Sequence, residues 1–332
     1  TVRSGTGLST VTVRRSDLEA LEFAAEATDG LVAVTGITEA RPQSETALHS
    51  TELYPAFSTS FGPYTAPSYF DPQRPFRLDV GVDLKASYAP APGWIMAGKL
   101  RQRLAGNVKD GRASNSVLPH VRTDQVLYAQ YGTTMENLYG ARSWKLSPDL
   151  YARSSLGYFE TMYGGISAEL LWKPVASPLA LGLEANYVVQ RDYDQRLGFR
   201  DYKTFTGHAS AYYELGGGYQ MQVDAGRYLA GDYGGTFSLD RVFSNGWVVG
   251  GFFTMTDVSA EDFGEGSFDK GFHFRIPLDW MLGKPSRNRF GTTIRPVQRD
   301  GGQKVHVPGR LYGQIRESHR ASLIDQRARI WE

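Results

Sequence analysis

In the stretch LALGLEANYVVQ at residues 179–190, apolar side chains occupy every second position. Its odd positions are apolar, whereas its even positions include Glu184, Asn186 and Gln190. Successive side chains of a β-strand point to opposite faces, so this pattern predicts a strand with one apolar and one polar face. The polar face needs water or a polar lumen, and the apolar face needs lipid or a second sheet.

The same period of two recurs along most of the chain. It is visible at residues 76–88, 219–226 and 247–256. We expect about twelve strands after residue 75, most of them roughly nine to thirteen residues long, a length that suits a tilted membrane crossing. Further strands are expected near residues 94–104, 122–131, 136–145, 149–159, 164–174, 202–214, 235–243 and 266–279.

The connections between these strands fall into two kinds. Short turns are expected at residues 147–149, 176–178, 216–218 and 244–246, and longer loops near 191–201, 228–234 and 257–266. Short turns at one rim and longer loops at the other are typical of membrane barrels. Trp94, Trp172, Trp247 and Trp280 fall at strand ends, where an interfacial aromatic girdle would lie.

These patterns predict an all-β fold, an antiparallel up-and-down transmembrane β-barrel of about 12–14 strands. A soluble β-sandwich or propeller also alternates and is the alternative. Such a fold seldom sustains long strands with one apolar face and one face this rich in charge.

Composition excludes several other classes. The 332 residues include 37 Gly and 19 Tyr, yet the mean hydropathy is −0.36, which argues against a helical membrane protein. The absence of cysteine excludes disulfides, thiolate metal sites and a cysteine nucleophile. A net charge of +1 argues against nucleic acid as a partner.

We expect four regions. Residues 1–40 read as a small β-α-β fragment, with a capping box from Ser16 to Glu19 and a second strand at 31–37. Residues 41–75 form a proline-rich linker with a possible first strand, and 76–280 form the barrel. The tail, 281–332, has eleven basic and four acidic residues, a net of +7, with one further strand possible at 290–298 and a short helix at 310–319. The chain opens at Thr1 without a signal-peptide pattern and reads as a mature or cropped chain.

Two polar clusters are candidate sites. The loop before residue 279 offers Glu261, Asp262, Glu265 and Asp269, either as a cation or sugar site at the barrel mouth or as a solvated loop in which Asp269 pairs with Lys270. The second cluster would either fix a loop through ion pairs or line a polysaccharide path, and it comprises Arg227, Tyr228, Asp232, Asp240 and Arg241.

Other inward residues admit a chemical interpretation. Glu169 and Glu184 lie on neighbouring strands, as the two carboxylates of a glycoside hydrolase would, or as part of a charge ladder across the lumen. His208 and Ser210 share a face, but the pleat explains that spacing, and lining of the lumen is the favoured interpretation. No histidine spacing typical of a metal site occurs, and we expect no metal and no cofactor.

Several longer strings resemble one family. They are GRYLAGDYGGTFSLDRVFSNGWVVGGFFTMTDVSAEDFGEGSFDKGFHFRIPLD at 226–279, LPHVRTD at 118–124, LYARSSLGYFETMYGG at 150–165, YVVQRDYDQ at 187–195 and VPGRLYGQIR at 307–316. The chain thereby resembles the YjbH/GfcD-type outer-membrane proteins of exopolysaccharide and capsule operons in Gram-negative bacteria, in their C-terminal portion. The resemblance implies a location in the outer membrane with a periplasmic N-terminal segment and tail. It also implies three kinds of partner: membrane lipid, exopolysaccharide, and periplasmic or lipoprotein components of the same secretion system.

Three functions are compatible with these observations. The favoured one is a non-enzymatic barrel for secretion or surface assembly of exopolysaccharide, whose long loops contact the polymer. A barrel enzyme acting on lipid or glycan would centre on His208, Ser210, Glu169 or Glu184. In a structural barrel the lumen would instead be closed by charge pairs, such as Asp79 and Asp83 with Arg77 and Lys85.

Overall fold

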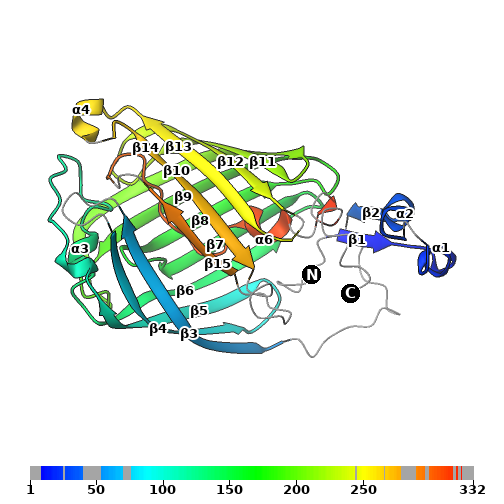
Figure 1. Cartoon of the computed structure of the whole chain (residues 1–332), viewed down its shortest axis with the longest axis horizontal. Coiled ribbons are helices and arrows are strands. Elements are labelled where there is room, and N and C mark those ends of the chain that lie inside the picture. The colour runs from blue at the N-terminus through cyan, green and yellow to red at the C-terminus, as the bar shows by residue number, and fades with distance from the viewer. Residues whose placement is uncertain are drawn as a thin grey trace.

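A curled β-sheet forms most of the molecule, with a small N-terminal unit at one end (Figure 1). The computed structural model describes residues 9–24, 27–39, 54–69, 76–243, 245–264, 266–277, 289–295, 299–316, 319–320 and 323. The strands are β1 (Ser9–Thr12), β2 (Gly36–Glu39), β3 (Ala56–Tyr69), β4 (Phe76–Ala89), β5 (Trp94–Gly106), β6 (Thr133–Lys145), β7 (Leu150–Tyr158), β8 (Tyr163–Trp172), β9 (Leu179–Arg191), β10 (Phe199–Gly216), β11 (Tyr219–Arg227), β12 (Tyr233–Val242), β13 (Val248–Thr256), β14 (Asp269–Pro277) and β15 (Arg289–Ile294). The helices are α1 (Arg15–Leu21), α2 (Ala27–Val34), the 3₁₀ turn η2 (Val108–Asp110), α3 (Gln125–Tyr128), α4 (Ala260–Phe263) and α6 (Leu311–Ile315).

The large sheet has 13 strands, in which each strand from β3 to β15 pairs with its neighbours in sequence. Neighbouring strands are antiparallel throughout, as the β9–β10 pairing exemplifies. Within the described residues β3 and β15 do not pair with each other, so the barrel is nearly closed. The expected up-and-down barrel of 12–14 strands is therefore confirmed. Among the described helices, none has the length and apolar character needed to cross a membrane.

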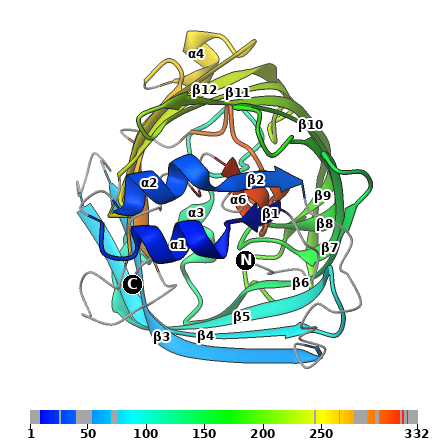
Figure 2. The ribbon, with the colours of Figure 1, turned by 90° about the vertical axis from the view of Figure 1, so that its right-hand side faces the viewer.

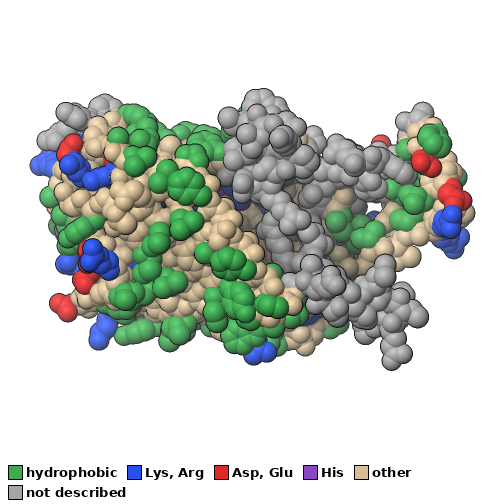
Figure 3. All heavy atoms as spheres, turned by 90° about the horizontal axis from the view of Figure 1, so that it is seen from below, with side chains coloured by type: hydrophobic (Ala, Val, Ile, Leu, Met, Phe, Trp, Pro, Cys, Tyr) green, Lys and Arg blue, Asp and Glu red, His purple; other side chains and the backbone are tan. Residues whose placement is uncertain are grey.

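The two faces of the barrel wall differ as the alternation predicts. On β9, the side chain of Leu183 is 59% exposed on the outside, whereas that of Asn186 is 1% exposed in the lumen. On β4, Arg77, Asp79 and Asp83 are buried. The space-filling view shows hydrophobic side chains spread over the outer wall, with charges gathered mainly at the left end of the barrel and on the N-terminal unit at the right (Figure 3). Apolar side chains thus face outward, the reverse of a soluble sandwich.

The two rims of the barrel also differ. At the short-turn rim, residues 90–93, 146–149, 173–178 and 217–218 connect strands. At the long-loop rim, residues 107–132, 192–198, 228–232 and 257–268 do so, together with one short turn at 159–162. Gly218 adopts a φ of +79°, and a Cβ there would lie 2.1 Å from the Val242 carbonyl oxygen, so this turn requires glycine. The tryptophans of the described residues stand at the short-turn rim, Trp94, Trp144, Trp172 and Trp247. Trp280 lies outside the described residues.

The expected strand at 122–131 is wrong. This segment belongs to a loop that contains η2 and α3. Its backbone amides at Arg122 and Thr123 donate to the carboxylate of Asp300 instead of to a neighbouring strand. The sheet includes two strands outside 76–280: β3 lies in the linker where a possible first strand was expected, and β15 overlaps the possible strand at 290–298.

The N-terminal unit is β-α-α-β rather than the expected β-α-β. The expected strand at 31–37 is instead the helix α2 followed by β2. Leu31, 2% exposed, is buried on α2, a position that alternation over seven residues did not reveal. The predicted capping box is also absent: Arg14 is the N-cap residue, and the Arg15 Nε donates to Glu19 at 2.7 Å within the helix.

This N-terminal unit lies across the short-turn mouth of the barrel (Figure 2). Its last residue, Glu39, accepts a hydrogen bond from the Val175 amide at 2.9 Å and lies 3.7 Å from the Lys145 ammonium. Burial at this contact raises the pKa of Glu39. The carboxylate therefore joins the unit to two turns of the rim.

Arg191 joins the end of β9 to three neighbouring segments. Its side chain is fully buried, and its guanidinium donates to five backbone carbonyl groups at 2.7–3.3 Å. These carbonyl groups belong to Met135, Glu136, Glu160, Gln195 and Arg196.

We expect Arg191→Met to lower the free energy of unfolding by about 3 kcal/mol or more, because buried carbonyl groups would lose their donor. Urea unfolding in detergent micelles, followed by tryptophan fluorescence, measures this. Arg196→Met, at an exposed position of the adjacent loop, is the control and should change stability by less than about 0.5 kcal/mol. Equal midpoints for the two variants would contradict the role given to Arg191.

Candidate functional site

The C-terminal residues 299–316, here called the plug segment, lie inside the barrel. Figure 2 shows α6, the end of this segment, within the ring of strands. At the long-loop rim the Gly302 amide donates to Asp232 at 2.8 Å. At the opposite end Arg316 donates to Gln220 on β11, next to the short-turn rim. The plug segment therefore runs through the lumen from one rim to the other.

Ion pairs hold the middle of the plug segment against the wall. Arg310 binds Glu184 through two bonds, Nε to Oε2 at 2.5 Å and Nη2 to Oε1 at 2.8 Å. The Lys304 Nζ lies 3.0 Å from Asp224 Oδ2. Both carboxylates are largely buried, so each needs a counter-charge to offset desolvation.

Glu169 and Glu184 are direct cross-strand neighbours, and both bind the plug segment. The Leu311 amide donates to both oxygens of Glu169 at 3.0 Å. Arg153, the partner of Glu169 on the next strand, donates to the Pro308 carbonyl at 2.5 Å. The predicted pair of carboxylates therefore exists. The Leu311 amide binds the oxygens of Glu169, and Arg310 binds those of Glu184.

Apolar contacts complete the seating of the plug segment. Tyr312 stacks on Tyr212 with ring centroids 3.8 Å apart. Leu311 and Ile315 belong to one buried cluster with lumen-facing side chains of β7, β8 and β9, while Val305 and Val307 belong to a second. The hydrophobic core of this protein thus lies inside the barrel, around the plug segment.

On the opposite wall of the lumen, formed by β4 to β6, charged side chains pair with one another and not with the plug segment. Glu136 on β6 pairs with Lys99 and Arg101 of β5, each at 2.5 Å. Arg103 lies 3.5 Å from Asp79 on β4. A cavity of about 270 Å³ remains on this side, lined by residues that include Arg101, Arg103 and His306.

The predicted cluster around residues 227–241 is divided by the barrel wall. Tyr228, fully buried, contacts Thr236 at 2.7 Å, and Asp232 binds the plug segment. Arg227 and Arg241 point outward, where their guanidinium groups lie over rim aromatic rings, Arg241 at 5.0 Å from that of Tyr219. The expected ion pairs within the cluster are not formed among the described residues, because strand alternation places the partners on opposite faces.

Asp240 instead pairs across the lumen face with β14. Its carboxylate lies 3.1 Å from His273 Nε2 and 3.7 Å from Arg275 Nη2. The strand between them carries Gly250, where a Cβ would lie 2.0 Å from Asp240 Oδ1. The glycine therefore leaves the space that Asp240 needs to reach His273.

The acidic loop before β14 does not form a cation site in the described residues. Asp269 is buried and pairs with Arg295, not with Lys270 as expected. The Lys270 Nζ donates to the Gly266 carbonyl and lies over the Phe268 ring, because neighbouring strand residues face opposite ways. Glu265 lies outside the described residues, within which no group of three potential metal ligands occurs.

His208 lies in the lumen beside Glu184, with its ring against that of Tyr228 at a centroid distance of 4.7 Å. Ser210 donates to Asp224 at 2.5 Å. The serine hydroxyl thus points to a carboxylate rather than to the histidine two residues away.

Sequence patterns missed the residues that form most of this site. Arg310 and Lys304 were counted only as part of a basic tail, and Asp300 and Asp224 were not singled out. One signal was available: the tail has a net charge of +7, so the preceding 280 residues carry −6, the difference from the total of +1. That complementarity indicates attraction between the two parts, but not where they meet.

Comparison with known proteins gives a consistent result. A family described as "Exopolysaccharide biosynthesis protein YbjH", the YjbH family, matches residues 1–317. A relative in Escherichia coli (strain K12), named "Uncharacterized lipoprotein YjbH", is 37% identical over 265 residues. That match covers 77% of this chain and 38% of the relative, so the chain spans well under half of the relative's length.

We expect Glu184→Gln and Arg310→Gln each to lower the free energy of unfolding by about 3 kcal/mol, because each leaves a buried charge without its partner. The double variant should cost about 2 kcal/mol less than the sum of the two, since the residues are in direct contact. A double-mutant cycle on urea midpoints measures this. The exposed pair Arg15–Glu19 is the control, with coupling below about 0.5 kcal/mol. Additive effects of Glu184→Gln and Arg310→Gln would contradict the pairing.

Proposed function

Since this chain belongs to the YjbH family of exopolysaccharide biosynthesis proteins, we propose that it is an outer-membrane barrel that takes part in secretion or surface assembly of exopolysaccharide without itself being an enzyme. The observation that carries the proposal is a barrel with an apolar exterior whose lumen, lined by charged and apolar side chains, is occupied by its own C-terminal segment. A barrel closed in this way could have its opening regulated, or it could act as a scaffold for other components of an assembly.

Several features support the location in the outer membrane. Leu181, Leu183 and Tyr187 are about half exposed on the outer face of β9, where lipid would cover them. The guanidinium of Arg142 lies 4.8 Å from the Trp94 ring and 5.0 Å from the Trp144 ring at the short-turn rim, as in an interfacial girdle. In membrane barrels short turns face the periplasm, so the N-terminal unit would lie there, near periplasmic or lipoprotein partners.

The plug segment favours a lumen that is closed at rest. It binds three strands of the wall, β8 through Glu169, β9 through Glu184, and β11 through Asp224 and Gln220, and one loop through Asp232. The charge pairs expected of a closed structural barrel therefore occur between wall and segment as well as within the wall. A path for polymer would require movement of the plug segment or would run outside it.

The non-enzymatic role rests on the chemistry around the candidate acid and base residues. Glu169 and Glu184, which a hydrolase would need free, both bind the plug segment. Ser210 donates to Asp224, so His208 is not its base in this arrangement. No reaction is assigned to these residues.

Reversal of charge in the plug segment should open the lumen. With Lys304→Glu and Arg310→Glu together, attraction to Asp224 and Glu184 becomes repulsion, and the segment should leave the wall. We expect near-zero steady conductance of the wild type in planar bilayers and sustained conductance of this double variant. Arg14→Glu with Arg15→Glu changes the same amount of charge at exposed positions and should stay closed. If the correctly folded double variant conducts no more than this control, the plug segment does not close the lumen.

Loss of the protein from its source bacterium should lower the exopolysaccharide at the cell surface, measured by uronic-acid or total-sugar assay of the surface fraction. Wild-type protein and the His208→Ala, Ser210→Ala double variant should both restore it, because neither side chain is assigned a reaction step. Removal of a true general base would lower the rate by about 100-fold or more. Failure of an outer-membrane-inserted double variant to restore the polymer would favour the enzyme alternative.

A further inference from the structure

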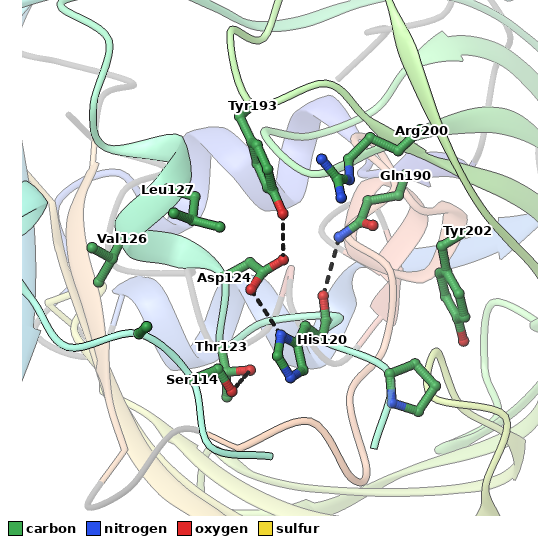
Figure 4. Close-up of a pocket in the computed structure, with 12 residues that line it drawn as sticks. Ser114, His120, Thr123, Asp124, Val126, Leu127, Gln190, Tyr193, Arg200 and Tyr202 are labelled. Carbon is green, nitrogen blue, oxygen red and sulfur yellow. Dashed lines mark hydrogen bonds and ion pairs between the residues drawn. The ribbon is translucent and has the colours of Figure 1, made fainter. Parts of the chain in front are cut away.

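A second cavity, of about 420 Å³, opens at the long-loop rim. It lies between the loop 107–132 and the residues that join β9 to β10, and Figure 4 shows the side chains around it. Its volume falls within the roughly 300–1,000 Å³ typical of small-molecule sites. The plug segment does not line it, although Thr123 of its wall also binds Asp300 of that segment.

Both ring nitrogens of His120 face hydrogen-bond acceptors in this cavity. Its Nδ1 lies 3.0 Å from Asp124 Oδ1, and its Nε2 lies 3.2 Å from the Ser116 carbonyl oxygen. Because both ring nitrogens face acceptors, both carry hydrogen in the arrangement that satisfies them. Burial alone would lower the pKa of His120, but these hydrogen bonds and the charge of Asp124 outweigh burial and raise it.

Asp124 is already engaged on both oxygens. His120 binds Oδ1, and the Tyr193 hydroxyl donates to Oδ2 at 2.9 Å, as the dashed lines of Figure 4 mark. Because both of its oxygens are engaged, this carboxylate is not placed to bind a further cation. Among the charged side chains that line the cavity, Arg200 remains.

Arg200 presents its guanidinium to the cavity without a carboxylate partner among the described residues. The group lies over the Tyr193 ring, 4.0 Å from its centroid. Stacking on an aromatic face holds the guanidinium plane and leaves its N–H edges available for two parallel hydrogen bonds to an anion. A carboxylate fits that geometry.

The rest of the lining suits a sugar ring. Tyr202 adds a second aromatic ring, fixed by its hydroxyl bond to the Leu229 carbonyl at 2.6 Å. Gln190 donates through its amide nitrogen to the His120 carbonyl at 3.0 Å, and its amide oxygen is an acceptor beside the same space (Figure 4). The hydroxyls of Ser114 and Thr123 also line this space as acceptors, since Ser114 donates to Thr123 at 2.6 Å and Thr123 donates to Asp300 at 2.6 Å. An apolar ring face beside several hydrogen-bonding groups is what a saccharide, with its hydroxyl edges and C–H faces, would contact.

We propose that this cavity is a binding subsite for an acidic sugar unit, a uronic acid residue of a polysaccharide, with its carboxylate on Arg200 and its ring against Tyr202. This inference rests on the proposed role in exopolysaccharide assembly. The subsite lies at the long-loop rim, which in a membrane barrel faces the cell exterior. Polymer would therefore be held at the surface side, outside the occupied lumen.

Isothermal titration of the full chain in detergent with trigalacturonate tests the subsite. We expect binding with a dissociation constant of about 1 mM or below, and weakening of about tenfold or more with Arg200→Gln. Arg196→Gln removes the same charge from an exposed position of the adjoining loop, residues 192–198, that does not line the cavity, and it should bind like wild type. Maltotriose, which has no carboxylate, should bind at least about tenfold more weakly than trigalacturonate.

Three results would overturn the proposal: equal binding of maltotriose and trigalacturonate, no effect of Arg200→Gln, or binding of inorganic phosphate as tight as that of trigalacturonate. The last would indicate a simple anion site. Measurement of surface exopolysaccharide in the strain without the protein distinguishes failure of the subsite proposal from failure of the proposed function. If trigalacturonate does not bind but loss of the protein lowers the polymer, only the subsite fails; if it binds and the polymer is unchanged, the proposed function fails.

Discussion

The ion pair between Arg310 and Glu184 depends on a constraint that governs the whole molecule: a charge removed from water needs a partner. Desolvation of one carboxylate costs several kcal/mol, and Glu169, Glu184 and Asp224 all point into one side of the lumen. The plug segment supplies Arg310, Lys304 and the Leu311 amide to these groups. The path of the segment and the acidic character of the wall therefore require each other.

Buried charges find their partners in different ways on the two sides of the lumen. Strands β4 to β6 pair their own charges, as Glu136 does with Lys99 and Arg101, and leave a cavity. Strands β8, β9 and β11 present Glu169, Glu184 and Asp224, which bind a segment far away in sequence. Removal of the plug segment would leave that wall acidic and unfavourable to an anionic polymer. This electrostatic asymmetry is consistent with polymer contact at the rim, where Arg200 lies, rather than along the acidic wall.

Local patterns failed where tertiary contacts compete with them. Residues 122–131 looked like a strand, but Asp300 binds the amides of Arg122 and Thr123 and holds a loop. Residues 31–37 looked like a strand, but packing of Leu31 favours the helix α2. The cluster from Arg227 to Arg241 looked like one site, although alternation along β11 and β12 already implied that its members face opposite sides of the wall.

Sequence alone was sufficient for the barrel, because a period of two records which face of each strand meets an apolar surrounding and which meets a polar one. It also placed Glu169, Glu184 and His208 on the inner face and showed a basic tail after 280 residues whose net charge is −6. Only the tertiary structure placed that tail in the lumen and brought Arg310 to Glu184, 126 residues apart in the chain. Periodicity describes the neighbours of a residue along its own strand, whereas the partner of a buried charge is decided by how the curled sheet encloses space.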